Sequence, residues 1–137
     1  MTGINAYLNF DGNCREAMTF YAKCLGGELQ IMTFGDAPME SSPGLKDKVM
    51  HAKVNKGPHV LMASDSDPRT TVSTGNNFSI CVQCESLEEI ERLYSAFSEK
   101  GTPAMPLQDT FWGARFGMLK DQFGIQWMFN FDTPRQG

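Results

Sequence analysis

Two stretches of the chain carry apolar residues at the three- and four-residue spacing of an amphipathic helix. The first opens at Asn13 and the second at Ser86, and each opening residue is followed three positions later by a glutamate, which is typical of a capped helix start. Glycines end the two patterns at Gly26 and Gly101. The predicted apolar faces are Ala17, Met18, Phe20, Tyr21 and Leu25 in the first helix, and Leu87, Ile90, Leu93, Tyr94 and Phe97 in the second.

Short strand-like runs surround both helices in the same order, one before and three after. Turn residues with a glycine separate the last two runs of each set, at 55–57 and at 121–124. The pattern predicts an α+β fold of two βαβββ modules with curved mixed sheets. The predicted runs are Ala6–Phe10, Glu28–Phe34, Val49–Val54 and Val60–Ser64, then Phe78–Val82, Ala104–Gln108, Ala114–Leu119 and Ile125–Phe131.

The length of 137 residues favours one domain, with half one at about residues 4–65 and half two at about 77–132. A polar stretch at 35–48 has the composition of a loop or lid, and 66–76 links the halves. Curved sheets of this kind offer a concave ligand pocket that two chains can share. We therefore expect a homodimer.

The net charge of -4 comes from scattered charges without a basic run, which argues against a nucleic-acid partner. No apolar stretch is long enough for a membrane span, and no export signal opens the chain, so we expect a cytoplasmic protein that does not bind membranes.

Cys81 and Cys84 have CxxC spacing, but they end a strand-like run and should face opposite sides. Small apolar roles are favoured over redox or zinc chemistry.

Several segments together resemble the PhnB-like group of the vicinal oxygen chelate superfamily, which includes glyoxalases, bleomycin-resistance proteins and extradiol dioxygenases. The resemblance covers nearly the whole chain and is most specific from Phe111 to Trp127. Gln122 departs from it, because the family turn has proline there. The segments are Tyr7–Asn13 with Glu16-Ala17 and Phe20-Tyr21, Met50–Ala52, Leu61–Asp65, Thr110–Gly113 and Lys120–Trp127.

The resemblance implies a divalent metal in the family's enzymes, held by four His, Glu or Gln ligands from the first and last strands of each half. Alignment places these positions near Ala6, Leu61 or Met62, Asn77 and Met128. None of them is a histidine or a carboxylate. We therefore predict that the chain lacks the inherited metal site and uses no cofactor.

Seven residues are candidates for ligand binding. His51 is the candidate general base, with a structural strand histidine as the alternative. Asp65 is either a ligand anchor or a loop cap, with the cap favoured. Arg115 suits a carboxylate or phosphonate, although an exposed hairpin arginine is the commoner case. The remaining candidates are the aromatic residues Tyr7, Phe78, Trp112 and Trp127.

These observations favour binding of a small organic ligand without a metal, and they leave open whether the protein is an enzyme. The alternative is a metal-dependent lyase or transferase of glyoxalase or fosfomycin-resistance type, with displaced ligands such as His51 with Asp65 or Glu28. Some relatives carry a ubiquinone-pathway methyltransferase label, but no glycine-rich loop for S-adenosylmethionine is present in the sequence. An antibiotic-sequestering module would need an acidic groove. The net charge is compatible with such a groove but does not favour this function over the others.

Overall fold

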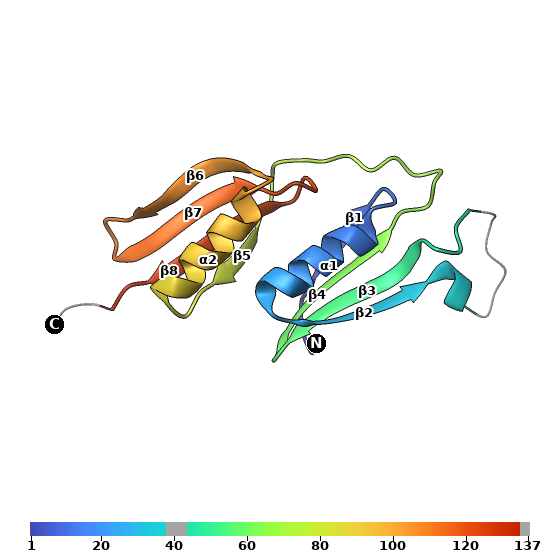
Figure 1. The fold of residues 1–137 in the computed structure, drawn as a ribbon, viewed down its shortest axis with the longest axis horizontal. Helices are drawn as coiled ribbons and strands as arrows, with labels where there is room; N and C mark the ends of the chain where they lie inside the picture. Colours follow the sequence, from blue (N-terminus) through green and yellow to red (C-terminus); the bar gives the residue numbers. More distant parts are fainter. Residues whose placement is uncertain (38–43, 135–137) are drawn as a thin grey trace. The chain divides into compact units, whose positions relative to one another are not determined.

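The computed structural model describes residues 1–37 and 44–134, which form two compact units, Met1–Ser73 and Thr74–Gly137 (Figure 1). Each unit has one helix and a four-stranded mixed sheet, as the α+β prediction required. Residues 38–43, in the middle of the predicted loop or lid, lie outside the described residues.

The first unit runs β1 (Ala6–Phe10), α1 (Cys14–Leu25), β2 (Glu28–Thr33), a 3-10 turn (Phe34–Asp36), β3 (Val49–Lys56) and β4 (His59–Asp65). Its strand order is β1-β4-β3-β2, with β1 parallel to β4 and the other neighbours antiparallel. The second unit runs β5 (Ile80–Gln83), α2 (Leu87–Ser98), β6 (Thr102–Asp109), β7 (Ala114–Lys120) and β8 (Gln126–Asp132), in the equivalent order β5-β8-β7-β6. The duplicated βαβββ order is confirmed.

Strand ends differ from the predicted ones by up to two residues. β5 begins at Ile80 rather than Phe78, because its pairing with β8 starts at Ile80 opposite Trp127. Conversely, β3 extends to Lys56, because backbone pairing with β4 continues to the turn at Lys56 and His59. The observed strand ends are set by backbone hydrogen bonds. Such bonds form whether or not the side chains are apolar, so the apolar pattern of the sequence does not locate the ends exactly.

One face of each sheet is covered by its helix. In the first unit α1 contacts β2, β3 and β4 (Figure 1), and Met18 and Tyr21 of the helix are fully buried. In the second unit the Phe97 ring of α2 lies 4.9 Å from the Trp127 ring and 5.2 Å from the Phe129 ring, centroid to centroid. Side chains of alternate parity point to the opposite side of each sheet, here called the helix-free face.

The start of α1 is held differently from the predicted cap. Asn13 lies at the N-cap position, but its side chain makes no cap hydrogen bond. The carboxylate of Asp65, at the end of β4, instead accepts from the Cys14 N–H at 2.9 Å and from the Val49 N–H at 2.9 Å. The predicted Asn13 cap is therefore wrong, and a distant carboxylate supplies the acceptor.

The other helix boundaries follow the predicted signals more closely. The Ser86 side chain accepts from the Glu89 N–H at 3.0 Å, while the Glu89 carboxylate accepts from the Glu85 N–H rather than from Ser86. Gly26 ends α1 in the left-handed region, with φ of 74°. Among the described residues, no helix is long and apolar enough to cross a bilayer.

The Asp65 cap can be tested by substitution. Asp65→Asn keeps the shape but turns one acceptor oxygen into an N–H₂ group, which leaves one buried N–H without an acceptor. We expect the free energy of unfolding to fall by about 1–3 kcal/mol, measured by urea unfolding followed by circular dichroism. Asp67→Asn is the control, because Asp67 pairs with its exposed neighbour Arg69, and its loss should lower the free energy of unfolding far less than the loss of Asp65 does. Equal losses for both variants would contradict the cap.

Candidate functional site

The helix-free face of the first sheet brings two of the candidate residues together. The Tyr7 hydroxyl lies 3.3 Å from His51 Nδ1, and the two ring centroids are 5.8 Å apart. Tyr7 is on β1 and His51 is on β3, so the contact is made above β4, the strand between them. On β4, Met62 is directly opposite Tyr7, and Ser64, two residues later, is directly opposite Asn9.

A β-bulge in β3 determines where His51 points. Met32 is opposite His51 and Thr33 is opposite Val49, so Met50 is an extra residue in the ladder. Val49 and Ala52 are both fully buried, although strict alternation would place them on opposite faces. The bulge resets the alternation and turns His51 away from the core. Bulges often re-aim a side chain in this way next to functional sites.

Soft apolar side chains flank the pair. Met62 is directly opposite Tyr7 on β4, and Met32 is directly opposite His51 on β2. Tyr7 and Met32 are each 44% exposed, so both present apolar surface on this face. Methionine adapts its shape to a partner more readily than branched residues do. The site therefore offers one polar pair in an adaptable apolar setting.

Lys53 belongs to the same face and was not among the sequence candidates. It lies two residues after His51 on β3 and directly opposite Met62. Among the described residues, no carboxylate lies within ion-pair distance of its ammonium group. Because alternate residues of a strand lie on one face, the sequence already indicates that Lys53 shares a face with His51.

Two of the other candidates have structural roles. Asp65 is 6% exposed and points toward the helix side, where it caps α1 rather than its own loop as the favoured alternative had it. Trp127 is 1% exposed, packs against Phe97 and donates from Nε1 to Asp121 at 2.8 Å. The expectation that Trp127 lines a ligand pocket is corrected, because its strand position faces α2.

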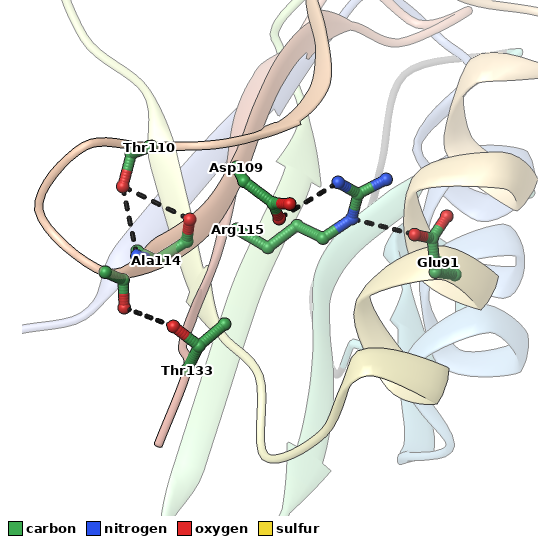
Figure 2. A network of polar contacts seen from close by, with 7 residues as sticks. Glu91, Asp109, Thr110, Ala114, Arg115 and Thr133 are labelled. Carbon is green, nitrogen blue, oxygen red and sulfur yellow. Dashed lines mark hydrogen bonds and ion pairs between the residues drawn. The ribbon is translucent and has the colours of Figure 1, made fainter. Parts of the chain in front are cut away.

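Arg115 is held by two carboxylates (Figure 2). Its Nε donates to Glu91 on α2 at 2.8 Å, and its Nη1 donates to Asp109 on β6 at 3.2 Å. Only 23% of its side chain is exposed. Two donors of the guanidinium group are therefore bound to carboxylates of the second unit, and binding of an anionic ligand by Arg115 stays a prediction.

The last two candidates are exposed aromatic residues of the second unit. Trp112 is 56% exposed in the connection between β6 and β7, and its ring centroid lies 5.0 Å from that of Phe111. Thr110 Oγ1 donates to the Ala114 carbonyl and accepts from the Ala114 N–H, and Thr133 Oγ1 donates to the Gly113 carbonyl; these hydrogen bonds fix the connection (Figure 2). Phe78 is 61% exposed and precedes β5. Neither side chain makes a hydrogen bond to another described residue that would mark a site.

The positions predicted to match the superfamily's metal ligands are near Ala6, Leu61 or Met62, Asn77 and Met128. Register places Ala6 opposite Leu61 in the first unit, and Met128 opposite Cys81 in the second. Apart from the amide of Asn77, these positions carry alkyl and thioether side chains, which do not match the His, Glu or Gln donors of a divalent cation. In residues 1–37 and 44–134, no three His, Cys, Asp or Glu side chains gather in a group that could hold a metal ion. The absence of a metal stays a prediction.

The cysteines of the CxxC segment face different environments. Cys81 is exposed, whereas Cys84 is 5% exposed, as the opposite-face expectation required. Burial raises the pKa of Cys84 to about 12, and it raises the pKa of Cys14 to about 12 as well. A redox CxxC needs a lowered thiol pKa, which is the reverse of this pattern.

Comparison with known proteins now identifies the family. The model of the family described as 3-demethylubiquinone-9 3-methyltransferase matches residues 2–129. The chain belongs to this family. The Escherichia coli (strain K12) protein YjdN is 30% identical over 93% of this chain and 93% of its own length.

Solved structures of related proteins agree with the family assignment. Protein PA1353 from Pseudomonas aeruginosa is 44% identical, with a TM-score of 0.87 over 96% of this chain and 98% of that one. A PhnB protein from Bacillus cereus is 29% identical, with a TM-score of 0.75 over 93% of this chain and 98% of that one. The PhnB-like resemblance is confirmed.

A more distant structure supports the superfamily fold alone. An enzyme of the glyoxalase/bleomycin resistance protein/dioxygenase family from Burkholderia phytofirmans PsJN is 14% identical, with a TM-score of 0.65 over 93% of this chain and 97% of that one. The PhnB-like family member therefore has the glyoxalase fold, as the sequence predicted.

Thiol labelling tests the cysteine environments of this family member. At pH 8 a thiol with a pKa of about 12 is ionised in about one molecule in ten thousand, so Cys14 and Cys84 should resist iodoacetamide in the native protein. Cys81 should be alkylated before them, because it is exposed. Peptide mass mapping with a denatured control measures the order. Rapid alkylation of Cys84, or a Cys81–Cys84 disulfide after mild oxidation, would contradict the assigned environments.

Proposed function

We propose that the protein binds a small organic ligand on the helix-free face of the first sheet, at the Tyr7–His51 pair, without a divalent metal. The observation that carries the proposal is the 3.3 Å contact between the Tyr7 hydroxyl and His51 Nδ1 on a partly exposed face. Polar groups that converge in an apolar setting are the usual composition of a ligand site. The bulge that turns His51 outward supports a role outside the core.

The pair can also serve proton transfer, although the proposal does not require a reaction. When His51 Nδ1–H donates to the Tyr7 oxygen, Nε2 carries the free lone pair and can accept a proton from a ligand. When the Tyr7 hydroxyl donates to Nδ1, Nε2–H becomes a donor instead. The tautomer therefore decides whether His51 acts as a base or as a binding group.

Methyl transfer is not part of the proposal. An S-adenosylmethionine site of the kind formed by a glycine-rich loop needs that loop between a strand and a helix. The described chain has two strand-to-helix connections, Asp11–Asn13 and Cys84–Ser86, and they contain a single glycine, Gly12. The family description names this activity, but these connections do not support it here.

We further propose a homodimer in the cytoplasm. Each sheet ends in strands with one neighbour within its unit, β1 and β2 in the first and β5 and β6 in the second. Such edges are natural places for pairing with a second chain. Light scattering at micromolar concentration tests this point, and a monomer would contradict it.

Ligand binding at the pair can be tested with the two histidines of the chain. A thermal-shift survey with small aromatic carboxylates, phosphonates, amides and alcohols should give at least one stabilising ligand. His51→Ala should then weaken binding about tenfold, and Tyr7→Phe by a smaller factor, since each removes a hydrogen-bonding group. His59→Ala is the matched control, because His59 is exposed at the start of β4. It should bind as the wild type does.

The outcomes separate cleanly. Unchanged binding by folded His51→Ala protein would overturn the assignment of the site. One tightly bound divalent ion per chain, found by metal analysis and required for ligand stabilisation, would overturn the metal-free part. That result would support the metal-dependent alternative instead.

A further inference from the structure

We infer that the ligand of this site is a small organic anion, a carboxylate or phosphonate attached to an apolar group, and that Lys53 binds its charge. The inference rests on the proposed function, because it names the ligand class for the same face. It depends on three features of that face: the unpaired cation of Lys53, the donor left over by the Tyr7–His51 pair, and the apolar surface between them.

The charge of Lys53 has no carboxylate partner among the described residues. The ion pairs found among the described residues include those of Arg69 and Arg115, and Lys53 takes part in none of them. Across the ladder Lys53 is opposite Gln30 on β2 and Met62 on β4, which are both uncharged. An uncompensated cation on a chain of net charge -4 is available to an anion from solution.

An acidic residue on the same face, Glu28, lies diagonally across the β2–β3 ladder from Lys53. Glu28 begins β2 and is directly opposite Asn55, two residues after Lys53. Diagonal neighbours of this kind are about 7–8 Å apart at the backbone. Glu28 can repel an anion that extends toward that edge, so the charged end of the ligand should lie on the His51 side of Lys53.

The Tyr7–His51 pair supplies one further donor in either tautomer. A neutral tyrosine and a neutral histidine carry two protons on their polar atoms, and their mutual hydrogen bond uses one of them. The other proton lies on His51 Nε2 or on the Tyr7 hydroxyl. Neither atom has another hydrogen-bond partner in the described residues. The pair is therefore a donor toward the ligand, which an anionic oxygen satisfies best.

The spacing suits one small acid. His51 and Lys53 are alternate residues of a strand, about 7 Å apart along the backbone, and the flexible lysine side chain can shorten that separation at its tip. Met62 lies between Tyr7 and Lys53 in the same row of the sheet. An acid group bound by Lys53 and the pair would place its apolar part over Met62 or Met32.

The test compares neutral and charged ligands of the same shape. Binding of benzoate, phenylphosphonate and benzamide to the full-length protein is measured by calorimetry, with affinity ratios as the result. Benzoate or phenylphosphonate should bind at least tenfold more tightly than benzamide. The stronger of the two identifies the acid group.

Substitutions assign the charge to Lys53. Lys53→Gln should lower the affinity for the acid about tenfold and change that for benzamide less than twofold, while Lys53→Arg should retain most of the acid affinity. Lys100→Gln is the control, since Lys100 is exposed after α2 and its loss changes the net charge by the same amount. It should leave the acid-to-amide ratio unchanged.

Each outcome has a distinct meaning. Equal affinity for benzoate and benzamide, with both lost in His51→Ala, would overturn the anion inference and leave the proposed site in place. An acid preference that persists in Lys53→Gln would overturn the role of Lys53. If all three probes failed to bind, the anion inference would be overturned for aromatic acids, and the broader survey with His51→Ala would decide the proposed function separately.

Discussion

The Asp65 carboxylate is the contact on which the geometry of the first unit depends. One buried side chain at the end of β4 accepts from the first residue of α1 and from the first residue of β3. It therefore fixes three elements at one corner, including the point from which β3 enters the sheet. Because the bulge at Met50 follows directly, the direction of His51 is set by that corner and by one extra residue.

The second unit repeats the topology but not this contact. There the buried carboxylate is Asp121, in the turn between β7 and β8, which accepts from the Phe123 and Ile125 N–H groups and from Trp127 Nε1. One unit thus ties a helix start to its sheet, and the other ties a hairpin turn to an aromatic core. A shared fold leaves each half free to place its buried charge differently, provided that its hydrogen bonds are satisfied.

The sequence predicted the elements well and the directions of their side chains less well. Alternation and helical spacing located all eight strands and both helices, because burial on one face leaves a periodic pattern. Trp127 was misplaced because β8 is apolar on both faces from Trp127 to Phe129, so its pattern does not say which face meets the helix. The ion pair of Arg115 was not foreseen, because Glu91 lies 24 residues earlier in the chain. The Asn13 cap was wrong because its competitor, Asp65, lies far along the sequence. The direction and the partner of such a polar side chain are set by residues far away in the sequence, so the local pattern does not predict them.

The division of each sheet into two faces has a consequence for divergence. Side chains such as Tyr7, Met32 and Met62 contribute little to the packing under α1, since they lie on the other side of the sheet. Mutations there escape the volume constraints that govern the core. Descendants of one ancestral chain can therefore acquire new ligand preferences by altering this surface while the hydrophobic layer beneath stays intact, and inheritance of the scaffold carries little information about what each descendant binds.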